Sequence, residues 1–163
     1  MKKLFAAILV LAMVLCMAAM AEETVLSYAD YIALDVSDGE VPVVVECYVQ
    51  DHQSWWDNKV SVYAADEDGA YFIYNMACSE EDAAKLVPGT KIRVTGYKSV
   101  WEGEIEIGEG ATFEFVEAEP VVFEPVDVTE FLGTEELINY QNRLVSFKGM
   151  TVEAYDENGA AFA

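Results

Sequence analysis

The stretch QDHQSWWDNKV, residues 50–60, contains the only histidine of the sequence and two of its three tryptophans. Successive side chains of a strand point to opposite faces, so one core does not readily take both Trp55 and Trp56. An indole left outside a core offers a flat face that stacks on sugar rings, bases or cationic side chains. The pair therefore predicts a binding platform, although large aromatic side chains are usually mostly buried and a structural role for either one fits equally well.

The same stretch gives no sign of catalysis. His52 lies near Asp51, Ser54 and Asp57, but the spacing matches neither a nucleophilic triad nor a pair of glycosidase carboxylates. The turns DEDG and DENG begin like a calcium loop but lack its later ligands. We therefore predict a protein that is not an enzyme, with no catalytic residue, no metal site and no cofactor.

Acidic side chains dominate the composition, with 30 Asp and Glu against 9 Lys and Arg and a net charge of −21. Without residues 1–21, which hold two lysines and no acid, 7 basic side chains face 30 acidic ones, a net charge of −23. Such a surface repels nucleic acid and anionic membranes. The charge therefore predicts a neutral carbohydrate or a basic peptide or protein as partner and no nucleic acid, unless it serves only solubility.

The first 21 residues have the pattern of a cleaved signal peptide. MKK supplies the positive start, an apolar run follows, and Ala19-Met20-Ala21 provides small residues at the cleavage site. The alternative is a lipoprotein signal with Cys16 as the lipidated residue, which Leu15 fits poorly. Both alternatives predict a secreted or extracytoplasmic protein with no membrane span in the mature chain.

Two cysteines remain after that segment, Cys47 and Cys78. An exported protein can join them in one disulfide, and two separately buried thiols are equally compatible with the sequence. The oligomeric state has no signature in the sequence.

Hydrophobic alternation and capping residues predict a mostly β domain. Ser27 with Asp30 forms a capping box, which places a helix over about 28–34. Ser79, followed by three acids and ended by Pro88-Gly89, predicts a second short helix. The alternating segments predict strands over 41–50, 59–66, 70–76, 90–101 and 105–117, the last interrupted at 108–110.

Three strands, a helix and two further strands follow the order of the OB-fold, a five-stranded Greek-key barrel. The stretch LVPGTKIRVTGYKSVWEGEIEI resembles this family most, and SWWDNKV and YNMACSEED are similar to secreted OB-fold domains of anaerobic bacteria. The resemblance covers about 28–118. It implies a binding module whose ligand crosses strands two and three between the first-to-second and fourth-to-fifth loops.

In that topology the three tryptophans are expected to flank one cleft, with aromatic neighbours on strands two and three. The predicted ligand-binding residues are Trp55, Trp56, Trp101, Tyr63, Tyr71, His52 and Asp57. We therefore predict an exported, non-enzymatic module that binds a neutral carbohydrate or a basic peptide or protein. The alternatives are a structural or interaction domain of a longer multidomain surface protein and, less favoured, a nucleic-acid-binding OB domain.

The predicted domains are a signal peptide at 1–21, an OB-fold domain at 22–118, a linker at 119–128 and the beginning of a second, truncated OB-like or β-rich unit at 129–163. The pattern VSVYAADEDGAYF returns as MTVEAYDENGAAF near the end of the chain. Because the sequence stops inside an expected strand, we predict that it is the front part of a longer protein.

Overall fold

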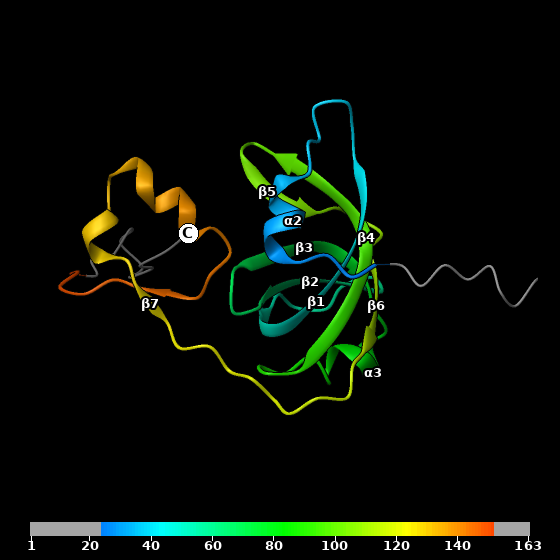
Figure 1. The fold of residues 1–163 in the computed structure, drawn as a ribbon. Coiled ribbons are helices and arrows are strands. Elements are labelled where there is room, and N and C mark those ends of the chain that lie inside the picture. The colour runs from blue at the N-terminus through cyan, green and yellow to red at the C-terminus, as the bar shows by residue number, and fades with distance from the viewer. Residues whose placement is uncertain (1–23, 152–163) are drawn as a thin grey trace, which may run out of the picture.

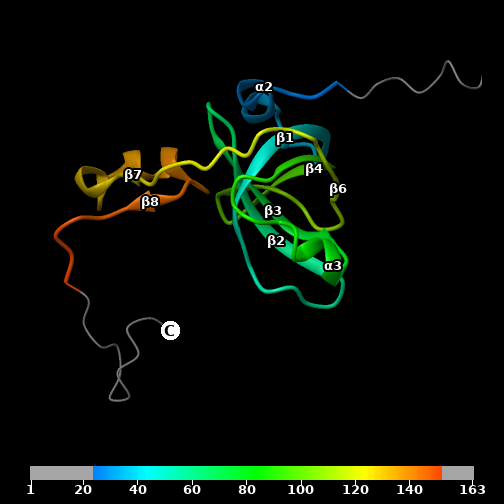
Figure 2. The ribbon, with the colours of Figure 1, turned by 90° about the horizontal axis from the view of Figure 1, so that it is seen from below.

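A computed structural model describes residues 24–151 of the chain as a barrel with a smaller C-terminal segment beside it (Figures 1 and 2). The predicted signal peptide, the alternative lipidation site at Cys16 and most of the predicted repeat at 150–162 lie outside the described residues. They remain predictions.

The described elements follow the predicted order. They are α2 (Tyr28–Ala33), β1 (Val41–His52), β2 (Lys59–Ala65), β3 (Ala70–Ala77), α3 (Glu80–Ala83), β4 (Lys91–Trp101), β5 (Glu104–Ile107), β6 (Thr112–Phe115), β7 (Val126–Asp127), η1 (Thr129–Phe131), η2 (Glu135–Tyr140) and β8 (Val145–Ser146). Side-chain capping by Ser27 and Ser79, as predicted, starts α2 and α3.

The strands close into a barrel in the order β1-β2-β3-β5-β4, with β4 pairing back onto β1. Only β3 and β5 are parallel within this sheet. Strands β5 and β6 pair with successive stretches of β4, so together they form the interrupted fifth strand that the sequence predicts. With α3 between β3 and β4, the architecture is the predicted OB-like barrel.

The predicted inward faces of the first two strands form the core. Buried there are Val43, Val45, Cys47 and Val49 from β1, with Val60, Val62 and Ala64 from β2. Gly96, where a bend was predicted, lies in β4 opposite this core, and a Cβ at that position would lie 2.6 Å from Ile107 Cγ2. The missing side chain therefore leaves room for the side chains of Ile107 and Ala111.

Cys47 and Cys78 are both buried free thiols, so of the two alternatives the structure shows the unpaired one. Burial raises the pKa of both thiols, that of Cys78 to about 11. At neutral pH both are protonated and behave as small apolar side chains.

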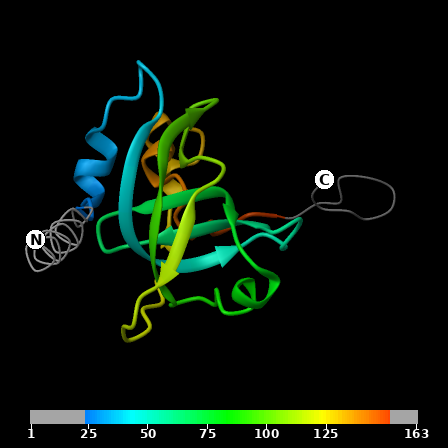
Figure 3. The same ribbon diagram turned by 90° about the vertical axis from the view of Figure 1, so that its right-hand side faces the viewer.

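Helix α2 is held to the barrel by a buried lysine, and Figure 3 shows the helix beside β1. The Lys98 side chain reaches inward from β4 and its residue is only 3% exposed. Its ammonium donates to the carbonyls of Tyr31, Ile32 and Leu34 at 2.9, 2.8 and 2.8 Å. These carbonyls lie at the end of the helix, where backbone acceptors run out of intrahelical donors and the dipole favours a cation; of the three, the Tyr31 carbonyl also accepts from the Leu34 amide at 3.3 Å. Desolvation lowers the pKa of Lys98.

The outer surface of β1, β4 and β6 carries a cluster of ion pairs around Glu46. Its carboxylate lies 2.7 Å from the Lys91 ammonium and 2.7 Å from the Arg93 guanidinium, which also pairs with Glu114. Hydrogen bonds from Lys91 and Arg93 hold the pKa of Glu46 below its usual range.

The chain after β6 runs along the barrel before it reaches the C-terminal segment. Val121 donates to the Gly89 carbonyl at 3.2 Å, and Phe123 packs edge-on to Tyr48. The predicted linker therefore contacts the barrel. The described part of the predicted second unit consists of two 3₁₀ helices, η1 and η2, and a two-residue parallel pairing of β7 with β8.

Within residues 24–151, no helix is both long enough and apolar enough to cross a membrane.

We predict that Lys98→Met destabilises the fold by about 2–3 kcal/mol, because one buried and two half-buried carbonyls lose a charged donor. Urea unfolding followed by circular dichroism measures this. The matched control is Lys85→Met, because Lys85 forms only exposed pairs with Glu81 and Asp82 and its loss should cost at most about 1 kcal/mol. Equal losses at the two lysines would contradict the role assigned to Lys98.

We also predict an acid-dependent contribution from Glu46. Its pKa is lower in the folded than in the unfolded state, so its stabilisation is present above pH about 4.3 and is lost as the pH falls toward the folded value. The stability difference between wild type and Glu46→Gln, about 1 kcal/mol at neutral pH, should therefore shrink below pH about 4. A difference that stays constant down to pH about 2 would rule out this linkage.

Candidate ligand-binding face

A run of aromatic side chains lies on the outer face of β2 and β3. The 66–69 turn pairs Tyr63 with Phe72, and their rings stack with centroids 4.9 Å apart. Tyr74, two residues further along β3, has its ring centroid 6.2 Å from that of Phe72 and is 41% exposed. The three rings therefore form a row along the two strands.

A polar hollow of about 240 Å³ lies at the end of this face, where the loop before β2 meets β3. Its lining residues are Gln53, Ser54, Trp56, Asp57, Lys59, Val60, Ser61 and Asn75. Trp56 and Lys59 exchange two backbone hydrogen bonds of 3.0 Å across a tight turn. Asp57 and Asn58 in this turn have φ of 50° and 59°, the left-handed values of a type I′ hairpin, in which Asp and Asn are favoured.

Trp55 and Trp56 point to different environments, as their adjacency predicts. The Trp55 indole is half-buried against the core and donates from Nε1 to the Cys78 carbonyl at 2.9 Å. Trp56 is 80% exposed. Only the second indole is thus free to stack on a ligand.

Trp101 lies elsewhere. It is 69% exposed at the turn between β4 and β5, where it pairs with Glu104. This turn lies near the start of β3, because β5 runs parallel to β3, whereas Trp56 lies near its end. The two loops are separated by the length of β2, roughly 20 Å of strand, so the structure does not bring the three tryptophans together.

Tyr71, predicted to face outward beside Tyr63, points inward instead. It is 1% exposed within the core, and its hydroxyl donates to Asp66 Oδ2 at 2.7 Å. The physical reason is the register of the hairpin, which pairs Ala65 with Ala70 and so makes Phe72 the outward neighbour of Tyr63. Burial raises the pKa of the Tyr71 phenol and keeps it protonated.

The two polar residues of the predicted set lie close to the hollow. Asp57 is in its lining, and the Nδ1 of His52 lies 2.7 Å from the Gln53 carbonyl. Among residues 24–151, no cluster of three or more His, Cys, Asp or Glu side chains is arranged to hold a metal ion.

All seven basic side chains after residue 21 lie in the described region, and each contacts an acceptor of the same chain. Lys59 pairs with Glu109, Lys148 with Asp127, and Arg143 donates to the Asp68 carbonyl. The other four, Lys85, Lys91, Arg93 and Lys98, are engaged as described above. Lys59 is the one that lines the polar hollow, and its partner Glu109 is exposed, so the pair is held weakly.

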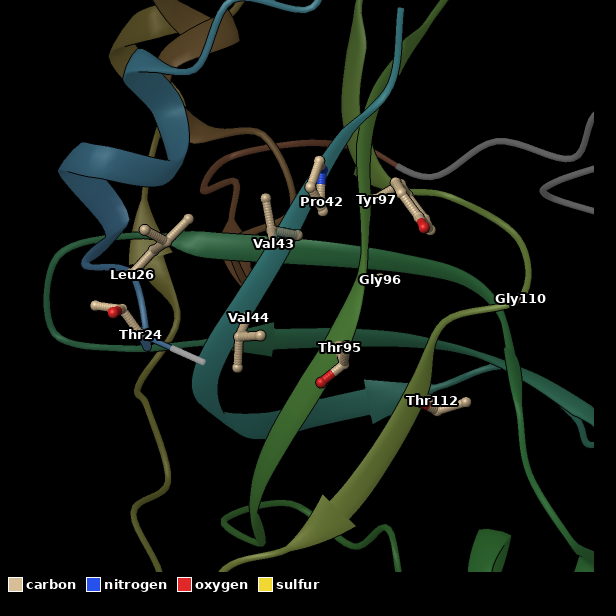
Figure 4. Close-up of a pocket in the computed structure, with 10 residues that line it drawn as sticks. All are labelled: Thr24, Leu26, Pro42, Val43, Val44, Thr95, Gly96, Tyr97, Gly110 and Thr112. Carbon is tan, nitrogen blue, oxygen red and sulfur yellow. The ribbon is translucent and has the colours of Figure 1, made fainter. Parts of the chain in front are cut away.

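A larger hollow of about 490 Å³ lies over β1, β4 and β6, between Thr24 and Leu26 on one side and Thr112 on the other (Figure 4). Its wall includes Val44, Thr95 and Tyr97. No charged side chain and no carboxamide lines it; its polar side chains are those of Thr24, Thr95, Thr112 and Tyr97, and Tyr97 is its only aromatic residue.

Comparison with known proteins gives similarity in fold only. No family model and no curated protein sequence matches the chain. Similar solved structures include the p204 HINb domain, with 10% identity, a TM-score of 0.45, and coverage of 57% of this chain and 47% of that one. A replication protein A heterotrimer bound to single-stranded DNA is 17% identical at a TM-score of 0.35 (50% and 58% covered). Aspartyl-tRNA synthetase from Entamoeba histolytica is 12% identical at 0.42 (64% and 24% covered).

Two predictions are corrected by this finding. We predicted a module for a neutral carbohydrate or a basic peptide or protein, and we expected no nucleic acid. The similar structures instead include a replication protein A heterotrimer bound to single-stranded DNA and an aspartyl-tRNA synthetase, and none of those named above is a carbohydrate- or peptide-binding module. Net charge limits phosphate contacts but says nothing of base stacking, so it does not by itself exclude a nucleic acid.

Sequence analysis missed Phe72 and Tyr74 and the carboxamides of Gln53 and Asn75. The sequence did contain a signal for the pairing of Tyr63 with Phe72. A turn at 66–69 pairs residue 65 with residue 70, and two further steps along each strand pair residue 63 with residue 72. Asn75 had no such signal, because it occupies a bulge with φ of 46° between the paired residues.

The two adjacent tryptophans should differ in their effect on stability. Trp55→Phe removes the hydrogen bond to Cys78 and leaves a small gap, so we predict a loss of about 1–2 kcal/mol. Trp56→Phe should change stability by less than about 0.5 kcal/mol. Chemical unfolding of both variants measures the difference, and a larger loss for Trp56→Phe would contradict the placement of these side chains.

Proposed function

We propose that the protein binds unpaired bases of a single-stranded nucleic acid, with Trp56 as the stacking platform. The observation that carries the proposal is the exposed Trp56 indole beside a hollow lined by Gln53 and Asn75. A flat π surface accepts any base, and carboxamides supply both donors and acceptors for base edges.

The position on the barrel supports the same function. The loop between strands one and two and the face of strands two and three are where OB-folds take oligonucleotides. Tyr74 is 41% exposed on β3, next in sequence to Asn75 of the hollow, and offers a second aromatic ring for a base. The activity proposed is binding, without catalysis.

Charge determines which interactions supply the affinity. Lys59 is the cation that lines the hollow, and most of the other basic side chains are held in pairs or buried. Exchange of Glu109 for a phosphate at Lys59 adds one contact at most. Binding therefore depends on stacking, and its logarithm should fall with the logarithm of salt concentration at a slope of about −0.7 or shallower.

We predict that octathymidylate quenches the tryptophan fluorescence of the protein in a saturable way at about 0.15 M salt. Trp56→Ala should weaken binding by about tenfold or more, because stacking on one aromatic ring contributes about 1–3 kcal/mol per base. The matched control is Trp101→Ala, which removes another exposed indole at the opposite end of β2 and β3 and should leave affinity within about twofold.

Two results would overturn the proposal. One is the absence of saturable quenching up to millimolar oligonucleotide. The other is an equal loss of affinity in the Trp56 and Trp101 variants, which would place the ligand away from the hollow. Duplex DNA of the same length serves as the control ligand. Its bases are already paired and stacked on each other, so the duplex should bind more weakly than the single strand.

A further inference from the structure

The outer face of β2 and β3 is covered at the end opposite Trp56. Ala65, Ala70 and Phe72 are 3%, 4% and 7% exposed, yet none of them belongs to the core cluster inside the barrel. They are buried from outside. The two halves of the face therefore differ: one is open at Trp56 and Tyr74, and the other is occupied.

The covering segment is residues 141–144, which we call the strap. Gln50 on β1 donates from Nε2 to the Asn142 carbonyl at 2.8 Å and accepts at Oε1 from the Leu144 amide at 3.0 Å. Asn142 Nδ2 donates to the Ile105 carbonyl on β5 at 3.2 Å. In the closed barrel, β1 and β5 are connected through β2 and β3 on one side and through β4 on the other. Gln50 bonds to Ala64, which pairs with Tyr71, and Ile105 lies beside Tyr71 in the parallel β3–β5 pairing. Asn142 therefore crosses the outer face of β2 and β3.

Further contacts fix the strap at its two sides. Gln141 donates to the Gly103 carbonyl at 3.0 Å and accepts from the Ile105 amide at 3.3 Å. Arg143 donates to the Asp68 carbonyl, in the turn between β2 and β3, at 2.6 Å. The strap is a turn in which Asn142 has φ of 62°, and Gln50 binds its backbone on both sides of Arg143.

The strap is held by polar contacts and not by a packed core. Leu144 is 45% exposed, and a crevice of about 480 Å³ lies between α2 and residues 138–141. Ile138 in its lining is 60% exposed. Each hydrogen bond between the strap and the barrel replaces hydrogen bonds to water, so it stabilises the bound strap only modestly. A ligand that forms its own contacts with the face can therefore displace the strap.

We propose that the strap is an intramolecular occupant of the binding face, and that a single strand long enough to reach Phe72 displaces it. The inference rests on the proposed function. With the strap in place, bases stack on Trp56 and Tyr74 alone. With the strap released, the row continues over Phe72 and Tyr63, so the site lengthens toward the Ala65–Ala70 pair. The strap therefore sets the length of strand that binds tightly.

The test compares wild type with Gln50→Ala, which removes both bonds from Gln50 to the strap backbone. Hydrogen exchange at the Leu144 amide reports strap release without any ligand. Two ordinary hydrogen bonds correspond to roughly a tenfold change in the strap equilibrium. We expect faster exchange, about tenfold tighter binding of octathymidylate, and unchanged binding of dithymidylate, which reaches only the open half.

Two further variants make the result decisive. Because Gln50 also donates to Ala64 within the barrel, the double variant Asn142→Gly/Arg143→Ala loosens the strap without altering any barrel residue. Asn139→Ala is the matched control, since it removes a carboxamide of η2, just before the strap, that makes none of the strap's hydrogen bonds. It should resemble wild type in both exchange and binding.

The outcomes separate the two claims. Faster exchange at Leu144 with unchanged octathymidylate affinity in both strap variants overturns the inference and leaves the proposed function standing. Absence of oligonucleotide binding by wild type and by the strap variants, with exchange at Leu144 accelerated, contradicts the proposed function itself. Tighter binding of dithymidylate as well as octathymidylate would show a general effect on the open half and would also overturn the inference.

Discussion

The buried ammonium of Lys98 holds helix α2 against the barrel, and other contacts of the structure depend on the position of that helix. Lys98 lies where β4 passes from β1 to β5, pairing with Val41 on one side and Ile107 on the other. Its three hydrogen bonds hold the end of α2 against the barrel. Tyr28 of this helix packs on Gly69 in the turn between β2 and β3 and on the Tyr71 ring. The position of that turn, and with it the Asp68 carbonyl that Arg143 contacts, therefore depends on Lys98.

The small number of basic side chains also limits the contacts available for the proposed function. The chain has 30 Asp and Glu against 9 Lys and Arg. Lys98 binds the end of a helix, and Lys91 and Arg93 pair with Glu46, so few basic side chains are left to contact phosphates. Under the proposed function, an OB-like barrel with this charge distribution recognises a single strand through its bases. Exposed Trp56, the Tyr74 ring and the carboxamides around them meet that requirement, and weak dependence on salt is its signature.

Patterns of two or three residues predicted much of the fold, and contacts between distant segments account for what was missed. Alternation identified the inward faces of β1 and β2, and the Ser27 and Ser79 caps identified α2 and α3. The inward turn of Lys98 depends on carbonyls some 65 residues earlier, which no local pattern reveals. The separation of Trp56 from Trp101 depends on the length of β2 and on the direction of β5, so family likeness alone placed them together wrongly.

The most direct test of where a strand binds is a titration of the isotopically labelled protein with tetrathymidylate, followed by amide and aromatic NMR shifts. We predict that the largest shifts fall on Gln53, Trp56, Tyr74 and Asn75, with little change at Trp101 or Tyr97. Shifts centred on Trp101, or on the hollow beside Tyr97, would contradict the account, as would a spectrum that does not change.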